Sequence, residues 1–175
     1  TNDTVLVFAN GAAGGDEIQE GTSEGDAFQE ALTYLCVNLA KELVVDAEGA
    51  QRLIEVFVEG AQSLHDARVA ARTIAASTLV KAMVHGRDPN WGRIMMALGM
   101  SGANFEESNV DIYINDIHMV HEGTAFPYLK DAVINAMSVS EVRFRVALHE
   151  GNANATAWGC DLTEEYVILN SAYST

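Results

Sequence analysis

The sequence predicts an α+β fold in which helices are layered on a mixed β-sheet. Some stretches repeat apolar residues with the period of a helix, whereas others alternate apolar and polar residues, as half-exposed strands do. The strand patterns occur both in adjacent pairs and between helical stretches, so hairpins and helical crossovers are expected together. With 175 residues, 49% of them hydrophobic, the chain is long enough to bury one substantial core.

The first third of the chain predicts a strand, a loop, a helix and a second strand. Residues 4–11 form a short apolar run that ends at glycine, and a loop rich in glycine and acidic residues follows. Asp26 and Gln29 fit a capping box for a helix that ends near Val45. Apolar and polar residues then alternate over 52–60, which indicates a half-exposed strand.

The middle of the chain is predicted to be helical. Ser63 and Asp66 form a second capping box, and the helix it opens is expected to break near Ser77 and stop at Gly86. After the turn of residues 88–93, DPNWGR, a short buried helix is predicted over 93–102. Within that turn we expect the tryptophan to pack in the core and the arginine to pair with the aspartate.

The last third predicts a hairpin, a helix and further strands. Alternating segments flank Asn115-Asp116, a pair that suits a tight turn. Pro127 is expected to begin a helix with Leu129 facing inward. Residues 141–151 give the clearest strand pattern, and residues 156–170 predict one or two more strands.

Composition excludes several classes of function. Ten basic residues against 25 acidic ones give a net charge of −15, which repels phosphate backbones and anionic lipid. We therefore expect no nucleic-acid or membrane partner. The negative charge would suit a cationic small molecule, but it is explained more simply by solubility. No apolar run approaches the roughly 20 residues of a membrane span. The two cysteines are too few for a disulfide framework, Cys36 is expected to be a buried free thiol, and a cytoplasmic location is predicted.

The residues alone supply few candidates for chemistry. Thr1 could act as an N-terminal nucleophile activated by its own amine, or could simply be the first residue of a processed chain. Glu48 lies at a glycine-bearing break, where its carboxylate could hold an ammonium group or merely be solvated. His118 and His121 are three apart in a predicted strand and should point to opposite faces, while the remaining histidines are scattered. No metal site is predicted.

Three blocks together show a family resemblance. The segments LVKAMVHGRDPNWGRIMMALG (79–99), DAEGAQRLIEV (46–56) and AWGCDLTEEYVILNSAYST (157–175) resemble ornithine acetyltransferase, the glutamate N-acetyltransferase of arginine biosynthesis. They occur in the family's order, and the resemblance covers essentially the whole chain. DPNWGR itself is expected to brace the structure and not to bind substrate.

The resemblance implies an activity and its chemistry. Family members cut themselves before a threonine into α and β chains, and that threonine becomes the nucleophile of the β chain. It takes acetyl from N2-acetylornithine and passes it to glutamate by a ping-pong route that needs no metal or organic cofactor, while some members also accept acetyl-CoA. The family nucleophile lies upstream of the position that Thr1 matches. No catalytic residue is therefore assigned within this chain, and Thr1 is not the nucleophile.

The resemblance also implies substrate-binding residues. Glu48, Asn170 and Thr175 match three binding positions of the family, and Glu48 is expected to hold the cationic end of ornithine. Asparagine and threonine side chains both donate and accept hydrogen bonds, which suits the carboxylate and amine of an amino acid.

The same resemblance implies a domain division and partners. Residues 1–50 should share catalytic layers with the α chain, and residues 51–175 should form a C-terminal α+β domain whose tail, 165–175, returns to the active site. The α chain of the same precursor and a second αβ pair are the expected protein partners. Two other functions remain open: a non-catalytic assembly domain, and a related self-processing aminopeptidase or amidase.

Overall fold

The computed structural model describes residues 3–172 and divides into two units, Thr1–Leu43 and Val44–Thr175. In the first unit, residues 3–22 form neither helix nor strand, so the predicted strand over residues 4–11 is wrong. An isolated strand leaves its backbone donors and acceptors without partners, and this segment pairs with no strand among the described residues. Its apolar side chains are instead exposed, Phe8 to 85%.

Helix α1 (Ser23–Val45) ends where the sequence predicts but begins earlier. Thr22 caps it, since its Oγ1 accepts a hydrogen bond of 3.1 Å from the Gly25 N–H. Asp26 therefore lies in the first turn and is not the cap. No residue of α1 is buried, so the expectation that Cys36 is a buried thiol is wrong: its side chain is exposed.

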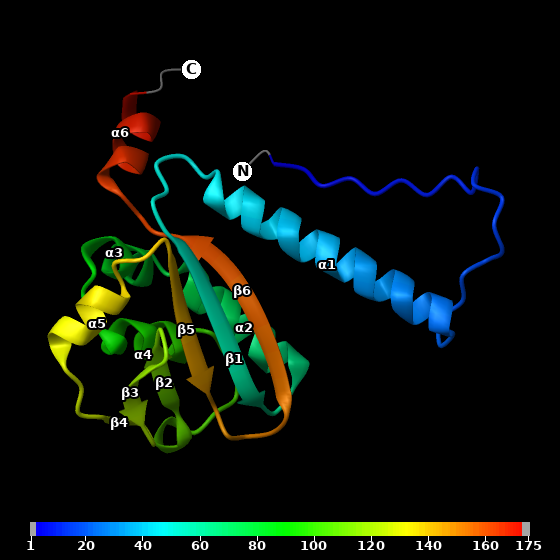
Figure 1. Ribbon diagram of the computed structural model, residues 1–175. Helices are drawn as coiled ribbons and strands as arrows, with labels where there is room; N and C mark the ends of the chain where they lie inside the picture. The colour runs from blue at the N-terminus through cyan, green and yellow to red at the C-terminus, as the bar shows by residue number, and fades with distance from the viewer. Residues whose placement is uncertain (1–2, 173–175) are drawn as a thin grey trace. The chain divides into compact units, whose positions relative to one another are not determined.

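The second unit is built on a six-stranded mixed sheet, which confirms the predicted α+β fold (Figure 1). The strand order is β4-β3-β2-β5-β1-β6, in which β1 pairs with β5 in parallel and every other pairing is antiparallel. The strands are β1 (Leu53–Ala61), β2 (Asp111–Ile114), β3 (Ile117–His121), β4 (Thr124–Ala125), β5 (Glu141–Ala147) and β6 (Ala153–Cys160).

Three helices pack together on one side of this sheet (Figure 1): the first contacts β1 and β6, and the other two pack on the first and on each other. Ser63 caps the first of them by accepting a hydrogen bond from the Asp66 N–H, and Ser77 separates the second from it, so both predictions are confirmed. The second helix ends at Gly86, as predicted, and Arg87 takes the left-handed conformation that follows. The helices of this unit are α2 (Leu64–Ala76), α3 (Thr78–Gly86), α4 (Trp91–Gly99), α5 (Lys130–Ala136) and α6 (Glu164–Ala172), with a single 3-10 turn, η1 (Glu107–Asn109).

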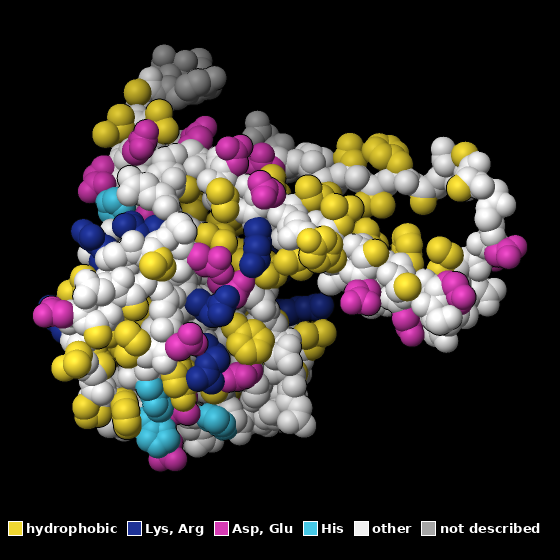
Figure 2. Space-filling model, viewed as in Figure 1, with side chains coloured by type: hydrophobic (Ala, Val, Ile, Leu, Met, Phe, Trp, Pro, Cys, Tyr) yellow, Lys and Arg dark blue, Asp and Glu magenta, His cyan; other side chains and the backbone are white. Residues whose placement is uncertain are grey.

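The two faces of the sheet differ in character. Apolar side chains of β1 and β5 face the helices and form the core, in the alternation that the sequence predicts. The opposite face carries paired charges, and Figure 2 shows acidic and basic side chains intermingled over it. Arg143 Nε lies 2.9 Å from Glu55 Oε1, and Arg145 Nη1 lies 2.8 Å from Glu59 Oε1.

The last third confirms some predictions and corrects others. Asn115 and Asp116 adopt positive φ angles of 43° and 66° and close the predicted hairpin without a glycine. Helix α5 begins only at Lys130, and Leu129 is 79% exposed and does not face inward. After β6, residues 164–172 form a helix and not a strand. Among the described residues, no helix combines the length and apolar character that a membrane span requires.

Candidate functional site

The turn between α1 and β1 is closed by a buried aspartate from the other end of the chain. Strand β6 runs antiparallel to β1 and places Cys160 opposite Leu53, so Asp161 emerges beside the turn. Its Oδ1 accepts hydrogen bonds from the backbone N–H groups of Gln51, at 2.9 Å, and Arg52, at 3.0 Å. Because Asp161 is only 3% exposed, these bonds fix the position of the turn relative to the end of β6.

Hydrogen bonds of Thr163 join this turn to α6. We call them the Thr163 clamp, and the bonds of Asp161 to the turn the Asp161 clamp. The Thr163 hydroxyl donates to the Gly49 carbonyl at 2.7 Å and accepts from the Tyr166 N–H at 3.2 Å, so it also caps the helix. Gly49 has a φ of 71°, and a Cβ atom there would lie 2.6 Å from the Tyr166 nitrogen. The glycine of the DAEGA block is therefore needed for close contact with α6.

These clamps bring together two of the three predicted binding residues. Asn170, on α6, donates a hydrogen bond of 3.0 Å from Nδ2 to Glu48 Oε2, and another of 2.9 Å to the Tyr166 carbonyl. Both Glu48 and Asn170 are exposed, so the pair presents a carboxylate and an amide to solvent. Such a pair can hold an ammonium group and orient a polar ligand. Thr175 and Thr1 lie outside the described residues.

Helix α3, which precedes the DPNWGR segment, supports this arrangement. His85 Nε2, on α3, lies 2.8 Å from Glu164 Oε2 at the start of α6, and His85 Nδ1 lies 3.5 Å from Asp161 Oδ2. The pKa of Glu164 is lowered, first by its own backbone N–H and then by His85. In addition, the Leu162 N–H donates to the Lys81 carbonyl at 3.3 Å. The helix that precedes the turn thus anchors the segment that carries Asn170.

Within DPNWGR, one prediction is supported and one is wrong. Trp91 is partly buried and packs against the core. Arg93 does not pair with Asp88: its Nη1 donates to the Leu79 carbonyl at 3.0 Å, while the Asp88 carboxylate accepts from Asn90 at 3.3 Å. The arginine therefore ties the start of α4 to the start of α3, which is a bracing role.

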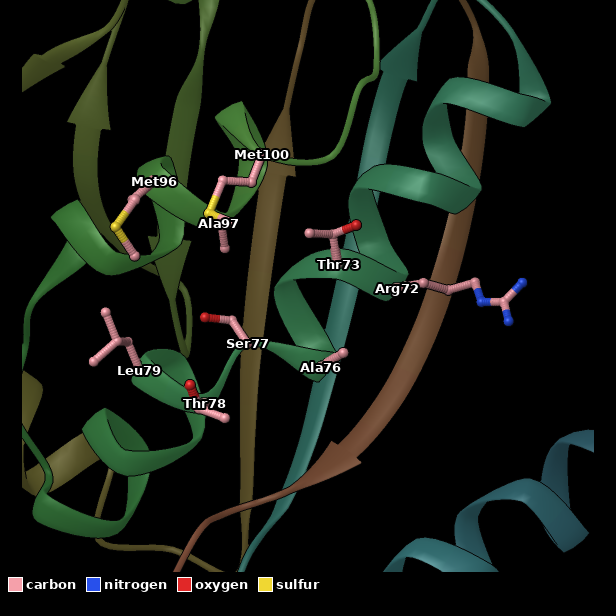
Figure 3. A pocket seen from close by; sticks show the side chains of 9 residues that line it. All are labelled: Arg72, Thr73, Ala76, Ser77, Thr78, Leu79, Met96, Ala97 and Met100. Carbon is pink, nitrogen blue, oxygen red and sulfur yellow. The ribbon is translucent and has the colours of Figure 1, made fainter. Parts of the chain in front are cut away.

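A hollow of about 590 Å³ lies among α2, α3 and α4 (Figure 3). Its lining is mostly apolar and shares no residue with the Glu48–Asn170 pair. In Figure 3 the Arg72 side chain extends away from the other lining side chains. The lining residues are Arg72, Thr73, Ala76, Ser77, Thr78, Leu79, Met96, Ala97 and Met100.

A cluster of histidines around Asp111 corrects one expectation. His118 and His121 do not point to opposite faces, because both approach the Asp111 carboxylate, with Nε2 and Nδ1 at 3.7 Å and 3.1 Å from Oδ1. His149, from the loop after β5, also has a partner: its Nε2 lies 3.1 Å from Asp111 Oδ2. Burial alone would raise the pKa of Asp111, but hydrogen bonds from the Glu122 backbone, His149 and His121 outweigh it and lower that pKa.

Residues three apart on a regular strand point to opposite faces, but this rule fails for His118 and His121 because the hairpin is irregular. Ile112 pairs with Val120 whereas Tyr113 pairs with His118, so one step on β2 corresponds to two on β3. The extra residue is a bulge, and it reverses the alternation of faces beyond it. Met119 and Val120 are accordingly buried in succession.

Comparisons with known proteins agree with this architecture. The model of the ArgJ family matches residues 1–175. The chain is 48% identical over 175 residues to the arginine biosynthesis bifunctional protein ArgJ of Symbiobacterium thermophilum, and 44% identical to that of Dehalococcoides mccartyi. Each match covers 100% of this chain, but only 44% of the first protein and 43% of the second. A crystal structure of the Bacillus halodurans protein of that name matches with a TM-score of 0.92 and 37% identity, over 99% of this chain and 82% of that one. The chain thus spans less than half the length of the curated relatives.

Proposed function

Because this chain belongs to the ArgJ family, we propose that it forms part of the β chain of a glutamate N-acetyltransferase. The complete enzyme moves acetyl from N2-acetylornithine to glutamate in arginine biosynthesis. The name shared by the relatives, arginine biosynthesis bifunctional protein, supports the pathway. Since the chain spans 44% of one such relative, the activity is assigned to the whole protein and only part of the substrate site to this chain.

The observation that carries the proposal is the contact between Glu48 and Asn170. The two residues match binding positions of the family, and 122 positions of sequence separate them, yet their side chains are 3.0 Å apart. Their shared position is held by the Asp161 and Thr163 clamps, which makes an accidental surface contact a poor explanation. An exposed carboxylate beside an amide suits the ammonium of ornithine.

In the proposed reaction, a threonine on the rest of the protein attacks the acetyl carbonyl of acetylornithine. The amide C–N bond breaks, ornithine leaves with the proton on its amine, and an acetyl-threonine ester remains. The amine of glutamate then attacks the ester, the C–O bond breaks, and the threonine hydroxyl is restored. Glu48 holds the ammonium end of the donor and Asn170 orients the Glu48 carboxylate, which positions the acetyl group for attack. The acetyl group passes through the ester without a cofactor, and acetyl-CoA is a possible second donor.

The first unit offers a surface for the proposed partner chains. Its apolar side chains lie along residues 5–8 and along α1, and exposed apolar patches of this kind typically mark interfaces. We assign this surface to the α chain of the same precursor, within an assembly of two α and two β chains. The exposed residues are Val5, Leu6, Val7, Phe8, Ile18, Phe28, Tyr34, Leu35, Leu39 and Leu43.

The test is a substitution that removes the charge of Glu48 in the complete, processed enzyme. Glu48→Gln keeps the size of the side chain and its contact with Asn170 but removes the charge. A hydrogen bond to a charged group contributes about 1.5–3 kcal/mol, so the KM for acetylornithine should rise roughly 10- to 100-fold. Glu165→Gln, on an exposed carboxylate of α6, is the matched control and should leave the KM near that of the wild type.

Two further readouts make this experiment decisive. Intact-mass spectrometry after brief exposure to acetylornithine should show an acetyl adduct on a β chain longer than these residues. Added glutamate should discharge that adduct faster than water does, whereas discharge by water alone would indicate a hydrolase of the aminopeptidase class. The role of Glu48 would be contradicted if Glu48→Gln left the KM for acetylornithine unchanged, or if Glu165→Gln raised that KM by the same factor.

A further inference from the structure

The histidine cluster lies on the open face of the sheet, at the end where β2, β3 and β4 meet. Figure 2 shows histidine side chains gathered on the surface at that end. The side chains of His118, His121 and Asp111 are 23%, 50% and 11% exposed. The group is therefore partly buried but accessible from solvent. One ligand atom from each of the three lies within 4.8 Å of the other two.

The imidazole of His118 is held in place by aromatic stacking. The Tyr113 ring lies on one side, with centroids 4.2 Å apart and planes at 12°, and the Phe126 ring lies 4.7 Å away at 24°. The Nε2 atom is buried, and it has no hydrogen-bond partner among residues 3–172. Buried polar atoms in native folds normally have a partner. A fixed nitrogen in this state is suited to an additional ligand.

Two of the distances between these polar atoms are close to the edges of a metal coordination shell. With metal–ligand bonds of about 2.0–2.2 Å, tetrahedral geometry places neighbouring ligand atoms roughly 3.3–3.6 Å apart. Asp111 Oδ1 is 3.1 Å from His121 Nδ1 and 3.7 Å from His118 Nε2. The second of these distances is too long for a hydrogen bond, but an ion between the two atoms would account for it.

We propose that Asp111, His118 and His121 bind a divalent ion of the zinc class. A donor set of imidazole nitrogens and one carboxylate binds Zn²⁺, Co²⁺ and Ni²⁺ in preference to Mg²⁺ or Ca²⁺. The Glu122 N–H, which donates to Asp111 Oδ1 at 2.8 Å, orients the carboxylate. His149, at 3.1 Å from Oδ2, either holds the second oxygen or supplies a fourth ligand.

This site is separate from the proposed substrate site. Along β5, Glu141 pairs with Leu53 near the Glu48 turn, and Ala147 pairs with Asp111 at the other end of the strand. The length of this strand separates the two sites by about 20 Å. In Figure 1, α6 and the β3–β4 hairpin accordingly lie at opposite ends of the sheet. The ion would cross-link the two strands of the β2–β3 hairpin, which carry all three ligands, and would take no part in acetyl transfer.

The experiment titrates Zn²⁺ into metal-stripped, complete enzyme by calorimetry, with Co²⁺ absorption as an independent report of ligand type. We expect one ion per copy of this chain, a Co²⁺ spectrum with nitrogen ligands, and a melting temperature that rises with zinc. His121→Gln removes a half-exposed ligand and keeps the Tyr113 and Phe126 rings that stack on His118, although it also removes the edge-on contact of His121 with that ring. It should weaken binding at least about tenfold. Asp111→Asn should weaken it as well.

The matched control is His65→Gln, since His65 is exposed and lies outside the cluster. It should bind zinc as the wild type does. The proposal is overturned if the wild type shows no saturable zinc binding, or if His121→Gln and Asp111→Asn bind as tightly as the wild type. The proposal is also overturned if His65→Gln loses as much zinc affinity as His121→Gln, because zinc binding would then be nonspecific. Unaltered acetyl transfer in His121→Gln is expected and separates this site from the substrate site.

Discussion

Asn170 donates a hydrogen bond of 3.0 Å from its Nδ2 to Oε2 of Glu48, although 122 positions of sequence separate the two residues. The amide is itself positioned by the Tyr166 carbonyl, one turn earlier in α6. The helix thus orients the carboxylate through the amide, and the two side chains should act as one unit.

A double-mutant cycle tests this coupling in the complete enzyme. Asn170→Ala and Glu48→Gln should each raise the KM for acetylornithine, and the double variant should raise it by less than the product of the two effects. Ser171→Ala, on the same helix, is the control and should leave the KM unchanged. Strictly multiplicative effects would show that the residues act independently.

The glycine of the DAEGA block should not tolerate a side chain. In Gly49→Ala, the left-handed backbone and the approach of Cβ to the Tyr166 nitrogen, 2.6 Å, both oppose the contact with α6. We expect a loss of about 1–3 kcal/mol in the free energy of unfolding, together with a raised KM. Gly99→Ala, where no atom lies within 4 Å of an added Cβ, should change stability by about 0.5 kcal/mol or less. Denaturant unfolding of both variants checks the contrast.

Acid should weaken the attachment of the N-terminus of α2. The Ser63 hydroxyl and then the Asn104 N–H lower the pKa of Asp66. A folded-state pKa below the unfolded value gives stability that is present above the unfolded pKa and lost as the pH falls through the folded one. The wild type should therefore lose stability below about pH 4, and Asp66→Asn should flatten that part of the profile. An identical pH profile in Asp66→Asn, measured by thermal melting, would show that Asp66 contributes nothing to it.

The hairpin turn contains two left-handed residues with different roles. Asn115 Nδ2 donates to the Ala136 carbonyl and its Oδ1 accepts from the Arg143 N–H, each at 2.6 Å. Asn115→Gly should therefore destabilise the protein by about 2 kcal/mol, even though glycine suits the backbone. Asp116 is exposed, so Asp116→Gly should be neutral or stabilising by about 0.5 kcal/mol. Similar effects of the two substitutions on denaturant unfolding would contradict these separate roles.

Local patterns determined most of the secondary structure. The capping box of Ser63 and Asp66 and the alternation along β1 involve residues only a few positions apart, so the sequence shows them directly. Helix α6 escaped prediction because Tyr166, Val167 and Ile168 favour strands. The overlooked signal is the Thr163 cap followed by two glutamates, which stabilise the first turn of a helix.

Family resemblance assigned Glu48 and Asn170 to the substrate site from sequence, but only the tertiary structure decided that they meet. Their contact depends on the pairing of β6 with β1 and on two clamps from residues more than a hundred positions away. The histidine cluster depends on a bulge that reverses the alternation of faces in β3, which no spacing rule detects. Secondary structure follows from interactions within a few residues, whereas the Glu48–Asn170 contact and the histidine cluster follow from the register of strands distant in sequence.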